Sequence, residues 1–150
     1  MPSATLTKSG DLPDVNVWLA LSAPDHLHYE RAQQYWNEES AEYIGFSRIT
    51  ALGYLRLTTN RHVMGGSTLT MPKAWQAYST LMAQPRVRFL DERADMESIF
   101  EPWALTGIVS QKNLTDAYLA AFANAASLRL VTFDSDFARF PGLNLLHLKP

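Results

Sequence analysis

The sequence predicts an α/β fold, in which helices cover both faces of a mostly parallel central sheet. Short apolar segments with strand-like residues alternate with longer helical segments almost throughout the 150 residues, a pattern typical of strand–helix–strand units. The clearest unit is 113–137, which combines a helix apolar on nearly every face with a short strand and an acidic turn. Such a helix belongs inside a core. We expect one domain over residues 1–150, with residues 1–10 as a flexible lead-in.

The composition excludes several classes of protein. The chain has no cysteine, so it forms neither disulfides nor a thiolate zinc site. No apolar run approaches the roughly 18 residues of a membrane span. The first residues lack the apolar stretch of a signal peptide, and we therefore expect a cytoplasmic protein without a membrane partner. A net charge of −2 argues against a surface that coats nucleic acid broadly, so such a partner must be held by a local patch.

The first part of the chain predicts two strands, each followed by a helix. A very short strand ends near Asp14, although Pro13 is unusual in a central strand because it has no N–H to donate. Asp14 and Asn16 are also suitable caps for the apolar helix that follows. The other expected elements are a helix over 24–39, a strand over 42–47, a helix over 48–57 and a flexible basic loop over 59–67.

The second part of the chain continues the alternation. Pro72 suits the first turn of a helix over 71–83. The acidic residues of 91–95 suit the start of a helix over 91–105, because carboxylates favour the positive end of the helix dipole. Strands are expected at 85–90, 128–132 and 144–148.

The aspartates of 113–137 are the first candidates for a functional site. Asp116 lies at the start of an otherwise almost uncharged helix, where Asn113 is a plausible cap and a carboxylate favours the helix dipole. That structural role would account for Asp116 alone. The following strand, however, ends directly at Asp134 and Asp136, at the edge of the sheet where ligands of α/β proteins collect. Acids gathered at that edge predict a negatively charged pocket that requires a cation.

Asp14, Asp116 and Asp134 share a position in this scheme, because each follows a strand or starts a helix on one side of the sheet. The sequence contains no nucleophile elbow and no Gly-rich phosphate loop. Three or four converging oxygens are what Mg²⁺ or Mn²⁺ binds. A cation so held polarises a phosphodiester, lowers the pKa of an attacking water and reverses the sign of the site. The residues therefore predict metal-dependent phosphodiester chemistry.

Basic and imidazole side chains have weaker signals. Arg56 lies on the 48–57 helix, where a guanidinium near the core commonly pairs with a carboxylate or binds phosphate; an ordinary surface salt bridge is the alternative. Arg56 or Arg48 would steady the developing charge of a phosphodiester. His26 and His28 stand two residues apart and do not share a helical face, so we do not expect them to bind a metal.

Five segments, in this order and spacing, resemble PIN domains, and within them the VapC-type ribonuclease toxins of bacterial toxin–antitoxin pairs. The segments are LPDVNVWLAL, PDHLHYERAQQYW, FSRITALGYLRLTTN, NLTDAYLAAFA and LVTFDSDF. The resemblance covers nearly the whole length. It implies a three-layer α/β/α PIN-like (Rossmann-like) fold and a toxin that hydrolyses RNA phosphodiester bonds with carboxylate-held Mg²⁺ or Mn²⁺.

The resemblance also implies roles for individual residues. Asp14, Asp116 and Asp134 match acidic positions of the family and would be catalytic. Asp14 and Asp116 would hold the metal, and Asp134 would do so directly or through water. Asn16 and Thr132 match small polar positions that support the site.

The sequence departs from the family at the second acidic position, where Ala51 stands in place of a common Glu. Asp136, or a water held by Thr50, is a hypothesis for the missing ligand. The loss leaves open an alternative function, a catalytically weakened PIN-like module that binds RNA or a protein. A receiver-like domain is a remoter alternative, because the only late lysine, Lys149, is terminal.

Partners follow from the resemblance as well. It implies an RNA substrate, a homodimer, and a cognate antitoxin protein whose C-terminal segment would lie across the acidic cleft and insert an Arg. Trp36, Trp75 and Trp103 are candidate interface anchors, although we expect at least two of them in the core.

Overall fold

The computed structural model of the chain describes residues 9–150. Its strands form one sheet in the order β3-β2-β1-β4-β5, and every neighbouring pair is parallel. The prediction of a parallel sheet is confirmed. The strands are β1 (Gly10–Pro13), β2 (Tyr43–Phe46), β3 (Val87–Phe89), β4 (Arg129–Thr132) and β5 (Leu145–His147).

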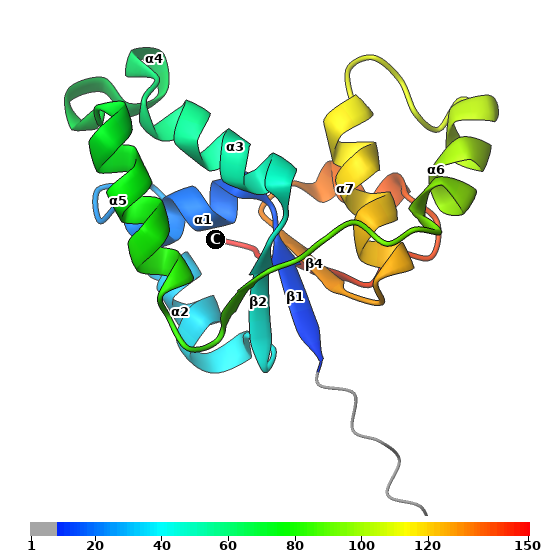
Figure 1. Cartoon of the computed structure of the whole chain (residues 1–150), viewed down its shortest axis with the longest axis horizontal. Coiled ribbons are helices and arrows are strands. Elements are labelled where there is room, and N and C mark those ends of the chain that lie inside the picture. The colour runs from blue at the N-terminus through cyan, green and yellow to red at the C-terminus, as the bar shows by residue number, and fades with distance from the viewer. Residues whose placement is uncertain (1–8) are drawn as a thin grey trace, which may run out of the picture.

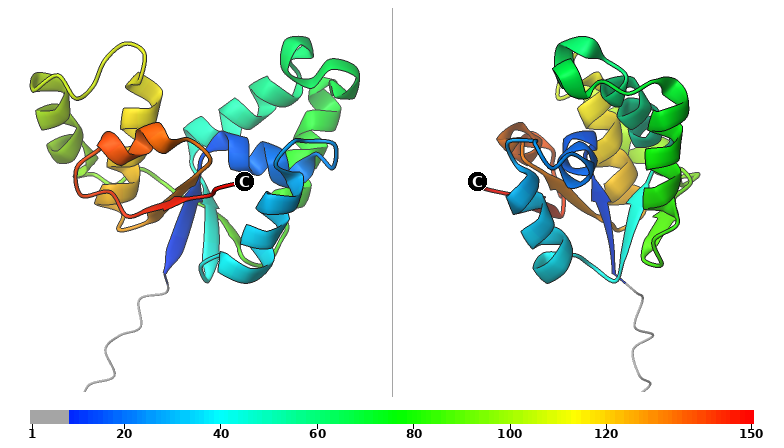
Figure 2. Two further views of the ribbon diagram at one scale, coloured as in Figure 1. Left: turned by 180° about the vertical axis from the view of Figure 1, so that it is seen from behind. Right: turned by 90° about the vertical axis from the view of Figure 1, so that its left-hand side faces the viewer.

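Helices cover both faces of the sheet, so the three-layer prediction is also confirmed. In Figures 1 and 2, α1, α2, α3 and α5 lie on one side of the strands, and α6 and α7 lie on the other. The bounds are α1 (Val15–Ser22), α2 (Tyr29–Gln34), α3 (Arg48–Thr58), α4 (Arg61–Met64), α5 (Met71–Met82), α6 (Met96–Leu105) and α7 (Leu114–Ala125). Shorter turns are the π-helical η1 (Tyr35–Glu39) and the 3-10 segments η2 (Gly65–Ser67) and η3 (Ser135–Arg139).

The two faces of the sheet support two separate hydrophobic clusters. Because side chains alternate along a strand, Val131 of β4 packs with α1, α3 and α5, while its neighbour Leu130 packs with α6 and α7. On the first side Trp18 stacks on Phe46 with ring centroids 3.9 Å apart. On the second side Ala117, Ala120, Ala121 and Ala123 of α7 are fully buried, which lets this helix lie close to the sheet. The expected buried helix is therefore present.

Strand β1 occupies the centre of the sheet despite its proline. It pairs with β2 only at Gly10 and Asp11, so Pro13 lies beyond that pairing. On the other side the backbone N–H of Asp14 donates to the carbonyl of Val131 over 2.8 Å. The missing N–H of Pro13 therefore costs no hydrogen bond to β2, and the strand carries Asp14 at its carboxyl end.

The amino end of β1 is held by a buried charged network that the sequence did not reveal. Asp11 is fully buried, and both of its carboxylate oxygens accept from the guanidinium of Arg129, over 2.8 and 3.0 Å. The hydroxyl of Tyr35 and the backbone N–H of Ala41 also donate to Asp11. Arg129 donates in addition to the carbonyl of Glu39 over 2.7 Å. This network joins β1, β4 and η1.

Several predicted boundaries were wrong. The helix predicted over 24–39 begins only at Tyr29 and turns π-helical at Tyr35. Its first residues form a turn, because Nδ1 of His26 accepts from the backbone N–H of His28 over 3.0 Å and competes with helical bonding. The loop predicted over 59–67 contains α4 and η2, and the side chain of Asn60 caps α4 by accepting from the N–H of His62.

Other differences are smaller. Residues 91–95 precede α6 rather than opening it. Asn113 stands at the N-cap position of α7, but its side chain makes no cap bond; it accepts from the N–H of Ser110 and donates to the carbonyl of Ile108. The predicted lead-in falls mostly on residues 1–8, which lie outside the described residues, while Gly10 already belongs to β1. Within residues 9–150 no helix is both long and apolar enough to cross a membrane.

Candidate active site

The neighbouring strands β1 and β4 bring two of the predicted aspartates to the same edge of the sheet. Asp14 directly follows β1, and Asp134 lies two residues after the end of β4. Thr132, the last residue of β4, connects them: its hydroxyl donates to Oδ2 of Asp14 over 3.2 Å and accepts from the backbone N–H of Asp134 over 3.0 Å. The structure therefore places Thr132 between these two acids.

Asp14 has both a capping role and an unusual electrostatic environment. Its Oδ1 accepts from the N–H of Val15 over 2.7 Å, so Asp14 is the N-cap of α1. Burial raises its pKa from 3.8 to about 6, and the negative charges of Asp116 and Asp134 add to this rise. The hydrogen bonds from Val15 and Thr132 act in the opposite direction without cancelling it. The capping role and the predicted site role therefore coexist in one side chain.

Asp116 approaches the same edge from the first turn of α7. Burial raises the pKa of this half-buried carboxyl, and the charge of Asp134 raises it further. The guanidinium of Arg139 acts in the opposite direction. Asp14 and Asp116 line the same pocket, so segments distant in sequence deliver these two carboxyls to one place.

Three hollows meet at these acids. The first, of about 350 Å³, is lined by Asp14, Asp116 and the adjoining residues of α3 and α7. Figure 1 shows α3 and α7 on either side of the sheet's carboxyl edge. The second, of about 530 Å³, contains Asp14 and Asp134 in its wall, and the third, of about 230 Å³, contains Asp116 and Asp136. Asp14 and Asp116 thus face one pocket in common.

The pair Asp14 and Asp116 fits a hard divalent cation. Across residues 9–150 neither carboxylate forms a salt bridge, whereas Asp11 is paired with Arg129 and Asp136 lies 3.6 Å from Arg139. The same residues contain no cluster of three or more His, Cys, Asp or Glu placed to hold an ion. Mg²⁺ commonly takes only one or two carboxylates and completes its shell with water and substrate phosphate. The donor set therefore fits the predicted two-carboxylate site.

Comparison with known proteins identifies the family. The model of the PIN domain family matches residues 12–143. The chain belongs to the PIN domain family. Ribonuclease VapC41 of Mycobacterium tuberculosis is 37% identical over 140 residues, which cover 89% of this chain and 95% of that protein. Ribonuclease VapC39 of the same organism is 34% identical over 128 residues, covering 85% and 90% of the two chains.

Solved structures share the fold of this PIN domain. The DNA-bound VapBC2 complex of Rickettsia felis matches with a TM-score of 0.66 at 15% identity and covers 93% of this chain and 99% of that one. VapC20 of Mycobacterium tuberculosis, a toxin that cleaves the sarcin–ricin loop, matches with a TM-score of 0.65 at 18% identity and covers 89% and 97%. At these identities the likeness concerns the fold.

The interpretation of Ala51 as the second acidic position of this PIN domain was wrong, because its side chain does not face the pocket of the acids. Ala51 is buried among the residues packed against α1 and α5, and it does not line the pocket. The face of α3 that does line it carries Ile49, Thr50, Leu52, Gly53 and Arg56. The error is one of helical phase, because positions two apart on a helix point in different directions. Gly53 lines the same pocket as the acids, and a Cβ at its position would lie 3.3 Å from Cγ2 of Val15.

The other predicted residues lie around the PIN-domain pockets in different ways. Arg56 is exposed at the rim of the first pocket, and Asn16 is exposed in the wall of the second. The hydroxyl of Thr50 is already bonded within the capping box that opens α3, where it meets Ser47. The idea that Thr50 holds a replacement water loses support, because this hydroxyl both donates and accepts within the box. Asp136 reaches Asp116 only through the third hollow.

Sequence reasoning missed the aromatic wall of the second hollow. His26, His28 and Phe133 line it together with Asp14 and Asp134. The spacing of the histidines argued against a metal site, but it contained no sign that their loop lies beside the end of β4. The one signal in the sequence for this aromatic wall was that Phe133 directly precedes Asp134.

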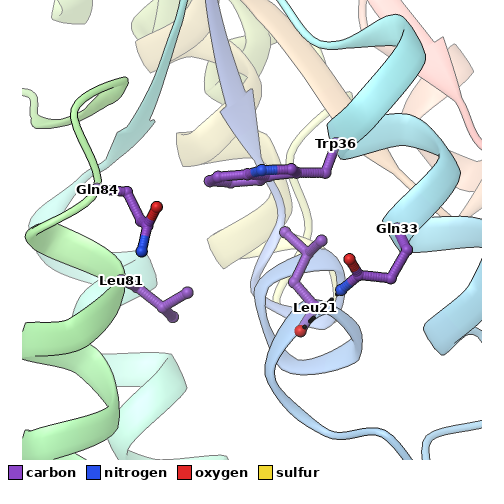
Figure 3. Close-up of a pocket in the computed structure, with 5 residues that line it drawn as sticks. All are labelled: Leu21, Gln33, Trp36, Leu81 and Gln84. Atoms are coloured by element: carbon purple, nitrogen blue, oxygen red, sulfur yellow. Dashed lines mark hydrogen bonds between the residues drawn. The ribbon is translucent and has the colours of Figure 1, made fainter.

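A further hollow of about 220 Å³ lies away from the acids and contains none of the predicted site residues. It is lined by Leu21, Gln33, Trp36, Leu81 and Gln84 (Figure 3). The amide of Gln33 donates to the carbonyl of Leu21 over 3.2 Å. None of the five lining side chains titrates near neutral pH, so this hollow has no group for acid–base or metal chemistry.

Proposed function

We propose that this PIN domain is a divalent-metal-dependent endoribonuclease and the toxin of a toxin–antitoxin pair. The observation that carries the proposal is the pair Asp14 and Asp116, which share one pocket, have raised pKa values and form no salt bridge within the described residues. Relatives that match almost their whole length are named ribonucleases. A pocket of this charge repels phosphate on its own, so RNA chemistry there requires a cation.

In this mechanism Asp14 and Asp116 hold Mg²⁺ or Mn²⁺, and Asp134 supports the site from the end of β4. The bound cation supplies charge neutralisation, polarisation of the phosphodiester and a lower pKa for an attacking water. The chain supplies the positioning: Thr132 fixes Oδ2 of Asp14, and the backbone N–H of Val15 fixes Oδ1. Preset ligands do not have to be reorganised when substrate arrives.

The basic side chains at the rim bind the RNA backbone in this proposal. Arg56 lies at the edge of the first pocket, and Lys112 and Arg139 line the third. A phosphate chain that passes over the acids would therefore meet cations on both sides, and such contacts dominate affinity for nucleic acids. Asn16 would contact sugar or base in the second hollow. The α3 face of the pocket still has no carboxylate, since Gly53 stands there, but the relatives named ribonucleases favour cleavage over the alternative of a weakened binding module.

A protein partner and a second copy of the chain belong to the same proposal. Solved neighbours include VapBC complexes, and the partner of this chain would be an antitoxin whose segment covers the acidic edge. Trp103 is buried and Trp36 is partly buried against the core, as expected, whereas Trp75 is 52% exposed on α5 near the exposed Met71. We assign this apolar face of α5 to a homodimer. An RNA-cleaving toxin of this kind would act in the cytoplasm.

A nuclease assay with matched variants tests the function. Wild type should cleave single-stranded RNA in Mn²⁺ or Mg²⁺ and lose activity on chelation. Asp14→Asn and Asp116→Asn should lose about 100-fold or more, since each removes a ligand of the reacting centre. Asp95→Asn is the control, because Asp95 is exposed and its side chain makes no cap bond. Equal cleavage by all four proteins would show that the activity comes from another site or from a contaminant.

A further inference from the structure

Three aromatic rings form a row in the wall of the second hollow, next to the proposed metal ligands. The rings of His28 and Phe133 are stacked, with centroids 4.5 Å apart and an interplanar angle of 21°. The ring of His26 follows, with its centroid 5.8 Å from that of His28. All three line the same hollow of about 530 Å³ as Asp14 and Asp134. We call these three side chains the aromatic ledge.

The backbone holds the ledge independently of the His28 ring. The N–H of His26 donates to the carbonyl of Ala23 over 2.8 Å, and the N–H of His28 donates to Nδ1 of His26 over 3.0 Å. On the other side, the carbonyl of Phe133 lies 3.0 Å from Nε2 of His147. The His28 ring forms no cap bond for α2. Its removal therefore breaks no hydrogen bond that shapes the turn.

The hollow has the size and lining of a small-ligand site. Its volume of about 530 Å³ falls within the range of roughly 300–1,000 Å³ that such sites occupy. Stackable rings form one part of the wall, and Asn16 adds an amide with donors and an acceptor. The two carboxylates repel a second phosphate, and a flat group that is polar at its edge fits the rings and the amide of this wall.

We propose that the aromatic ledge receives an RNA base next to the phosphate that is cleaved. This proposal rests on the proposed ribonuclease function, since Asp14 lines both the first pocket and the hollow of the ledge. Because Asp14 lies in the wall of both hollows, the ledge adjoins the place where a phosphate bound at Asp14 and Asp116 would lie. Bases stack on aromatic rings in single-stranded RNA, where they are free of pairing. The ledge thus selects unpaired RNA.

Equilibrium binding and steady-state kinetics test the ledge with short single-stranded RNA oligonucleotides. His28→Ala should weaken binding to the Asp116→Asn background and raise KM in the active protein, each by about 5- to 150-fold, which is the effect of losing one base–ring stack. The kcat should change little. His28→Phe should restore binding, because it keeps the ring without the imidazole nitrogens. His62→Ala is the control, since His62 is exposed on α4 and lines none of the three hollows at the acids.

Each outcome decides between the two proposals. If wild type cleaves RNA and His28→Ala binds and cleaves as wild type does, the base site is overturned, and the ledge is left for a protein partner. If His28→Phe lowers kcat as strongly as His28→Ala does, the stacking role is overturned in favour of a role for the imidazole in the reaction. If wild type binds RNA through His28 but cleaves none, the ledge stands and the nuclease function fails. Thermal unfolding of each variant checks that the fold is intact.

Discussion

Asp11 and Asp14 lie at opposite ends of β1 and should respond oppositely to the same substitution. In the metal-free protein Asp14→Asn should raise stability at neutral pH, because it removes a buried carboxylate that lacks a cationic partner. Asn retains an oxygen to cap α1, and its amide can donate to the Thr132 hydroxyl. Asp11→Asn should lower stability, because it leaves the guanidinium of Arg129 without its bidentate partner.

The raised pKa of Asp14 sets the size of the stability gain expected for Asp14→Asn. A rise from 3.8 to about 6 corresponds to about 3 kcal/mol of lost stability at high pH, at 1.36 kcal/mol for each pKa unit. Below 3.8 the carboxyl is protonated in both folded and unfolded chains, and this penalty is absent. Between 3.8 and about 6 the unfolded chain releases its proton first, so stability falls as the pH rises. We expect Asp14→Asn to gain about 1–3 kcal/mol at pH 8.

Thermal and urea unfolding in a chelator provide the assay. The gain for Asp14→Asn corresponds to about 3–10 °C in Tm for a protein of this size, and it should shrink as the pH is lowered from about 8 to about 4.5. Asp11→Asn should lose about 2–4 kcal/mol, somewhat below the cost of breaking a fully buried pair because Arg129 is partly exposed. A loss of stability in Asp14→Asn at pH 8, or a gain independent of pH, would refute the electrostatic reasoning.

Three further predictions follow from the same geometry. Gly53→Glu should tighten Mn²⁺ binding measured by calorimetry, because it adds a carboxylate to the pocket. Ala51→Glu should instead bury an unpaired charge and cost several kcal/mol in urea unfolding. Equal effects of the two substitutions would contradict the assigned helical phase of α3. Thr132→Val should cost about 1–3 kcal/mol, since the N–H of Asp134 loses its acceptor, and should raise the pKa of Asp14 further, as carboxyl NMR titration would show. Mn²⁺ at 100 times its Kd should add about 2.7 kcal/mol to wild-type stability, and the absence of any Mn²⁺-dependent shift in Tm would argue against the metal site.

The fold could be predicted from the sequence because its strongest signals are local. The apolar helix and strand of 113–137 have the periodicity of buried elements, and each strand is followed by a helical segment. Boundaries failed where side chains redirected the backbone. His26 accepts a backbone hydrogen bond that turns the chain before α2, and Asn113 bonds to Ser110 and Ile108 instead of capping α7.

The site was predictable only in part, since its components differ in how they reach the sheet edge. Asp14 and Asp134 follow strands, so parallel pairing alone brings them to one edge, and Asp116 follows from its position in α7. The phase of α3 could not be deduced this way, and Gly53 was overlooked in favour of Ala51. The aromatic ledge depends on a loop conformation between α1 and α2, which leaves no periodic trace in the sequence. The Asp11–Arg129 pair joins residues 118 positions apart.

The Asp11 network has a consequence for the opposite end of the central strand. Asp11 anchors β1 against both Arg129 and η1, so the strand cannot slide along β4 to let Asp14 retreat from its acidic neighbours. The repulsion between Asp14 and its acidic neighbours at the carboxyl edge therefore persists, because the contacts of Asp11 fix the amino end of β1. A cation binds to ligands that are already in position, and the loss of the repulsion between the carboxylates on binding contributes to its affinity.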